Sequence, residues 1–92
     1  MKQFTPDEVW RTIDALEAQL IWERWAEHER RDEGFADLQD AILRTIRELG
    51  LATTLNEAVD LTIIMRRVLR HQLGLWIGEA SEREFGKYFT RP

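Results

Sequence analysis

The sequence predicts an all-α fold on three kinds of observation. Three segments have the composition of a capping box, in which a Ser or Thr side chain and a Glu three residues later satisfy two backbone N–H groups at a helix start. Apolar residues then recur every three or four positions, the spacing of one helix face. Gly50 and Gly74 each follow one of the segments with this helical spacing. We therefore expect a compact helical bundle of three main helices plus a short C-terminal helix, dimeric, with all 92 residues in one domain, residues 1–92.

The first helix is expected from Pro6 to about Arg31, with Thr5 and Glu8 as its capping box. This segment carries two apolar faces, the second about 120–220° further round the helix than the first. The first face consists of Val9, Ile13, Leu16 and Leu20, and the second of Ala18, Ile21, Trp22, Trp25 and Ala26. A single straight helix in a monomer does not need both faces.

The second helix is expected over residues 35–49, because its apolar residues keep the helical spacing. Gly50 follows as a left-handed C-cap. The third helix is expected from Leu55 to about Leu73, with the segment TLNE as its capping box and Gly74 at its end.

A short last helix is expected over residues 82–89, with Ser81 and Glu84 as its capping box. The C-terminal stretch LGLWIGEASEREFGKYF, residues 73–89, is rich in aromatic residues, which favours a lid that closes the thin core of so small a domain. The alternative is an arm exchanged with a neighbouring subunit, for which the link LGLWIG would act as a hinge.

Two large aromatic rings stand among charged residues in the segment IWERWAEHERRDE. One explanation is that the following helices fold back and cover Trp22 and Trp25. The other is that this part of the first helix projects and docks on a second chain, since Trp is enriched at the centre of interfaces and charged residues at the rim. The candidate partner-binding residues are Ile21, Trp22, Trp25 and Glu29. The expected partner is a second copy of the chain, or a different protein.

Two pairs of acidic residues are each spaced by one helical turn, Glu29 with Asp32 and Glu57 with Asp60. Two such pairs facing each other could hold Mg²⁺ through oxygen ligands. This arrangement resembles the MazG-like all-α nucleotide pyrophosphohydrolases, whose helices carry paired acids. The resemblance implies Mg²⁺-dependent hydrolysis of a nucleotide as an alternative function, although no lysine stands beside the pairs to meet a phosphate.

Three arginines of the third predicted helix, Arg66, Arg67 and Arg70, are candidate phosphate-binding residues. A weak nucleic-acid binder is therefore a further alternative. The net charge of −4 and the lack of a recognisable helix-turn-helix argue against it. Residues 1–40 hold eleven acids and five bases, so pairing of these arginines with the acidic first helix explains them more simply.

The remaining composition predicts neither catalysis nor a cofactor. There is no cysteine for thiol chemistry or a thiolate–metal site, and neither histidine occurs in a Glu-x-x-His motif, so we expect no metal. The longest apolar stretches are too short to span a bilayer, and the N-terminal segment does not read as a signal peptide. We therefore expect a cytoplasmic, non-catalytic protein–protein interaction module: a small regulator, adaptor or assembly factor.

Overall fold

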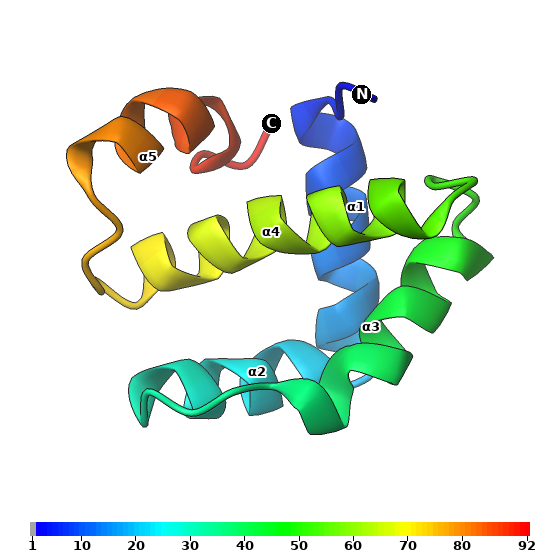
Figure 1. Cartoon of the computed structure of the whole chain (residues 1–92), viewed down its shortest axis with the longest axis horizontal. Helices are drawn as coiled ribbons and strands as arrows, with labels where there is room; N and C mark the ends of the chain where they lie inside the picture. The colour runs from blue at the N-terminus through cyan, green and yellow to red at the C-terminus, as the bar shows by residue number, and fades with distance from the viewer. Residues whose placement is uncertain (1) are drawn as a thin grey trace.

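The computed structural model describes residues 2–92, and within them every regular element is a helix. Five α-helices are followed by one turn of 3₁₀-helix (Figure 1). In chain order the elements are α1 (Pro6–Ala18), α2 (Ile21–Arg30), α3 (Ala36–Glu48), α4 (Leu55–Gln72), α5 (Glu79–Phe85) and η1 (Gly86–Tyr88). The predicted all-α class is therefore confirmed.

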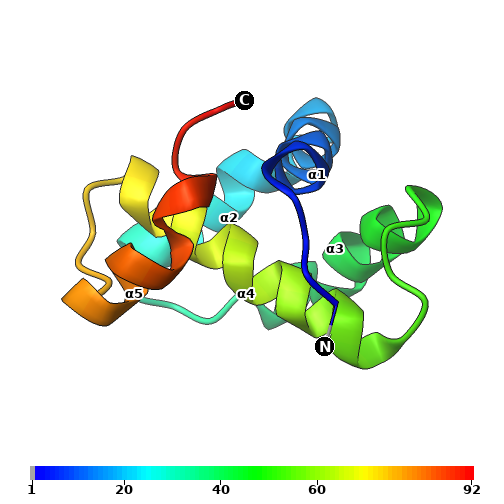
Figure 2. The same ribbon diagram turned by 90° about the horizontal axis from the view of Figure 1, so that it is seen from above.

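The helices pack around α1, which contacts α2, α3, α4 and η1. Helix α1 runs steeply across α4 (Figure 1). Viewed from above, α3 lies beside the N-terminal half of α4 and α5 beside its C-terminal half (Figure 2). The core between them contains side chains from every main helix, among them Ile13, Trp25, Ile42, Leu61 and Met65.

The prediction of one continuous helix over residues 6–31 is wrong, because the chain breaks at Leu20. The backbone of Leu20 is left-handed, with φ +63°, and α2 leaves in a new direction (Figure 1). The bend lets the two apolar faces of this segment enter the same core. Leu20, expected on the first core stripe, is instead 62% exposed.

The first predicted capping box is confirmed: the Thr5 hydroxyl accepts from the Glu8 amide, and the Glu8 carboxylate accepts from the Thr5 amide. The bond from the Thr5 backbone lowers the pKa of Glu8. At α4 the Thr54 hydroxyl accepts from the Glu57 amide as expected. The Glu57 carboxylate reaches one residue further back, to the amide and hydroxyl of Thr53, and these bonds lower its pKa.

The third predicted capping box is wrong. Helix α5 begins at Glu79, two residues before Ser81, and its N-cap is Gly78 with φ +91°. The predicted helix over residues 82–89 is divided between α5 and η1. Its role as a lid is visible in Tyr88, which is buried and lies against the start of the chain.

Two hydrogen bonds hold this lid in place. The Trp10 indole N–H donates to the Tyr88 carbonyl at 2.9 Å, and the Tyr88 hydroxyl donates to the Phe4 carbonyl at 2.7 Å. Residues more than 75 positions apart are thereby fixed to each other. The C-terminal segment is thus a part of the core of its own chain.

Candidate functional site

Trp22 and Trp25 are buried, at 5% and 0% exposed. Their rings meet edge to face at 5.6 Å between centroids, and Phe35 packs on Trp25 at 4.8 Å. Ile21 and Glu29, the other two predicted partner-binding residues, are buried as well. The expectation that these side chains project from the domain is therefore wrong, since other helices of the same chain cover them.

Glu29 is the buried acceptor of an ion-pair network between α2 and α4. Its carboxylate receives the Nε–H of Arg66 at 2.5 Å and lies 3.8 Å from Nη1 of Arg70. Arg70 also donates to the Trp76 carbonyl at 3.2 Å. Arg67 lies over the Phe85 ring, 5.8 Å from its centroid. Arg66 and Arg70 thus pair with an acid of the predicted first helix.

The two acidic pairs do not form a four-carboxylate centre. Glu29 is paired with Arg66 in the C-terminal half of α4, whereas Glu57 caps the other end of that helix. Asp32 lies beyond the end of α2 with φ +54°. Within residues 2–92, no three His, Cys, Asp or Glu side chains are grouped as metal ligands.

The outer face of α4 carries three exposed aliphatic side chains at i, i+4 and i+8, here called the α4 face. Leu55 is 67% exposed, Val59 37% and Ile63 42%. The sequence analysis did not single out this stripe, because it described the third helix only by its bounds and caps. A second apolar stripe on the side of α4 opposite Leu61 and Met65 was the signal that could have revealed it.

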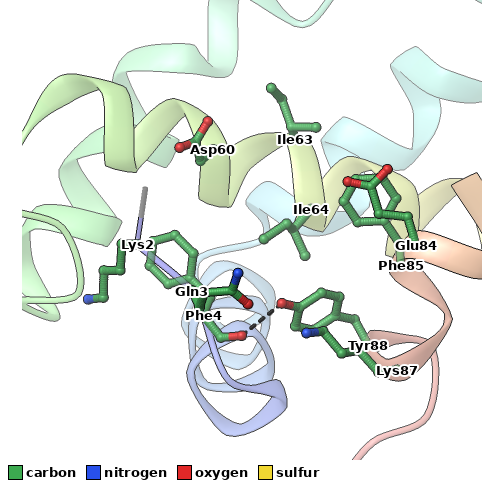
Figure 3. A pocket seen from close by; sticks show the side chains of 10 residues that line it. All are labelled: Lys2, Gln3, Phe4, Asp60, Ile63, Ile64, Glu84, Phe85, Lys87 and Tyr88. Carbon is green, nitrogen blue, oxygen red and sulfur yellow. Dashed lines mark hydrogen bonds between the residues drawn. The ribbon is translucent and has the colours of Figure 1, made fainter.

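A pocket of about 310 Å³ adjoins the α4 face, with Ile63 belonging to both (Figure 3). The N-terminal segment, α4, α5 and η1 supply its walls. Charged side chains stand among its lining residues, lysines from the chain ends and carboxylates from α4 and α5. The lining residues are Lys2, Gln3, Phe4, Asp60, Ile63, Ile64, Glu84, Phe85, Lys87 and Tyr88.

Trp76 is the most exposed large apolar side chain of the described residues, at 84%. It lies in the link between α4 and α5, in the aromatic stretch that was predicted to form the lid. The side chains of that stretch are divided, with Tyr88 in the core and Trp76 in solvent. The tryptophan available to a partner is therefore a different one from the pair singled out in the sequence.

A second concavity, here called the acidic groove, lies between α2 and the end of α4 and holds about 670 Å³. Trp22 lines it and donates its indole N–H to Gln72 at 3.2 Å. Three glutamates and one arginine contribute charge, and Arg30 is paired with Glu27 at 2.5 Å. The surplus of carboxylates favours cationic over anionic groups at this groove. Its lining residues are Glu17, Trp22, Glu23, Ala26, Glu27, Arg30, Leu69, Gln72 and Leu73.

None of the helices within residues 2–92 has the length and apolar character needed to cross a membrane. Comparison with known protein families, curated proteins and solved structures finds no match to this chain. The function is therefore inferred from the surfaces described above.

Proposed function

We propose that this protein is a non-catalytic protein–protein interaction module, a small regulator, adaptor or assembly factor, and that it acts as a homodimer. The observation that carries the proposal is the α4 face. Leu55, Val59 and Ile63 expose aliphatic surface to water along one line of a helix, although apolar side chains gain free energy when buried. Clustered apolar surface of this kind is typical of a protein interface.

A second copy of the chain fits the α4 face because the stripe is self-complementary. Around a two-fold axis near Val59, Leu55 of one copy would lie near Ile63 of the other, and the reverse. A domain of 92 residues has a thin core, and oligomerisation adds buried apolar surface to it. The acidic groove shares no lining residue with the α4 face and would stay available to a different partner with cationic side chains.

The ion pairs and hydrogen bonds of the charged candidate residues also support an interaction role over a nucleotide hydrolase or a nucleic-acid binder. Glu29 and Arg66, taken from the candidate metal and phosphate sites, neutralise each other. Glu57 accepts hydrogen bonds at the start of α4. A nucleotide hydrolase or a phosphate-binding surface would need these groups for its ligand.

The mass of the purified protein, measured by light scattering over a concentration series, tests the proposal. We expect a mass that rises from one chain to two. Val59→Glu should weaken the dimer at least tenfold, because two carboxylates would meet near the axis. Leu20→Glu is the matched control, since Leu20 is an exposed leucine between α1 and α2 and its replacement should leave the dimer intact.

Circular dichroism should show unchanged helix content in both variants, because both side chains are exposed. A mass of one chain at every concentration would contradict the homodimer. Equal effects of the two substitutions would contradict the α4 face as its interface.

A further inference from the structure

The acidic groove follows one face of α2, from the second residue of that helix to its last. The lining side chains of α2 recur at helical spacing: Trp22, Glu23, Ala26, Glu27 and Arg30. They extend over about 12 Å, roughly two helical turns. The last turn of α4, which contacts α2, supplies the opposite wall. A groove of this length between two helices has the form in which a third helix packs.

The floor of the groove is apolar. Trp22, Ala26 and Leu69 line it and are at most 6% exposed, and Leu73 is half-buried. Trp22 is held in place, since its indole N–H donates to Gln72. The volume of about 670 Å³ lies within the range of roughly 300–1,000 Å³ for binding sites and has room for more than one side chain. The floor therefore favours a partner with several apolar anchors.

Two carboxylates at the groove have no cation from their own chain. Glu27 is paired with Arg30 and with Arg31. Glu17 and Glu23 form no ion pair within residues 2–92. The charged lining side chains are three carboxylates and one guanidinium, so a balance of −2 remains.

The helix ends at the groove add negative charge of a second kind. Glu17, Arg30 and Gln72 stand in the last turns of α1, α2 and α4. The C-terminal end of a helix carries a partial negative charge, equivalent to about −0.5 elementary charge. Of the helix starts, that of α2 alone contributes lining residues. Backbone and side chains therefore both favour a cationic partner.

We propose that the acidic groove binds a basic amphipathic helix of a different protein. Apolar side chains of that helix pack on the floor, and its arginine or lysine side chains pair with Glu17 and Glu23. The statement rests on the interaction role proposed above and names the chemistry of the partner. Helices that dock in grooves use anchors one and two turns apart, which matches the length of this groove. A different protein is favoured over a second copy because the groove shares no lining residue with the α4 face.

A synthetic helical peptide with leucines at i, i+4 and i+7 and arginines beside them is the probe. Fluorescence anisotropy of the labelled peptide should show saturable binding, with one peptide per chain. A peptide with glutamates in place of the arginines, and one with alanines in place of the leucines, should each bind at least tenfold more weakly. Added salt should weaken binding of the basic peptide, because exposed charges are screened.

Charge reversal on the protein locates the site. Glu23→Arg should weaken binding of the basic peptide at least fivefold, and the double variant with Glu17→Arg at least tenfold. Asp40→Arg is the matched control. Asp40 is an exposed acid of α3 that forms no ion pair and does not line the groove, and its reversal changes the net charge equally. Affinity of this control should stay within twofold of the unsubstituted protein, and circular dichroism should show unchanged helix content in all variants.

The possible results separate this inference from the homodimer. Equal losses of affinity in Glu23→Arg and Asp40→Arg would overturn the groove as the site, because net charge alone would then explain binding. Absence of saturable binding, or equal binding of the alanine peptide, would overturn the proposed partner and leave the homodimer standing. A change in chain mass on Glu23→Arg would mean that a second copy occupies the groove, which also overturns it. Peptide binding by a protein that stays a single chain would support this inference without the homodimer.

Discussion

Glu29 shows how one residue sets the relation between two helices. Its carboxylate is 1% exposed, whereas Arg66 and Arg70 keep 40% and 20% of their side chains in contact with solvent. A carboxylate so far from water has to be paired, because an unpaired buried charge costs several kcal/mol. The position of α2 along α4 is therefore restricted to one in which both guanidinium groups reach Glu29.

Glu29→Ala should lower the free energy of unfolding by about 2 kcal/mol. This is less than the roughly 3–5 kcal/mol of fully buried pairs, because the two arginines can turn toward water. Glu23→Ala, an exposed glutamate of the same helix, should change stability by less than about 0.5 kcal/mol. Urea unfolding followed by circular dichroism measures both, and equal effects would show that the network contributes nothing specific.

The contacts of single residues also explain which parts of the candidate site could be predicted from the sequence. The partners of Glu29 are 37 or more positions away, so their pairing depends on tertiary packing, although a pairing with the acidic first helix was foreseen. The burial of Trp22 and Trp25 depends on where α3 and α4 lie, which composition does not encode. The exposure of Trp76 was missed because aromatic content alone does not tell a core ring from a displayed one.

At the scale of the element, the break at Leu20 turns one predicted helix into two. A capping box is a local signal, and the start of α1 was therefore predictable from four residues. The end of α1 was not, because leucine is an unusual residue in the left-handed region. The two apolar faces of residues 6–31 were the visible sign that the segment could not be one straight helix.

Leu20→Gly should raise the free energy of unfolding by about 0.5–1 kcal/mol. The left-handed backbone costs a residue with a Cβ atom about 1–2 kcal/mol, and the added freedom of glycine in the unfolded chain returns about half of this. Ala18→Gly, two positions earlier at the end of α1, should instead lower it by about 0.5–1 kcal/mol. Thermal unfolding of the three proteins under one set of conditions gives the comparison, and a loss of stability in both variants would contradict the strain at Leu20.

At the scale of the whole molecule, distant segments close the bundle. The C-terminal lid and the N-terminal segment meet through Tyr88, which is 4% exposed. Its hydroxyl and its carbonyl are both engaged, one with Phe4 and the other with Trp10. Tyr88 thus closes the core as the predicted lid would, whereas Trp76 of the same aromatic stretch stays 84% exposed.

Tyr88→Phe should lower the free energy of unfolding by about 1–2 kcal/mol while the fold is kept. The ring still fills its place, but the Phe4 carbonyl loses its donor in a buried position. Urea unfolding should give a lower midpoint with an unchanged slope. An unchanged midpoint would mean that water replaces the hydroxyl.

The bond between Tyr88 and Phe4 also sets an order of events during synthesis. Proteins are made from the N-terminal end, and helical domains fold quickly once their segments are available. Here the Phe4 carbonyl and the Trp10 indole lie 84 and 78 positions before Tyr88, so both are made well before the η1 residue that they bind. A nascent chain can form α1 to α4 early, yet it stays open on the side that η1 covers until η1 itself has been made and has folded.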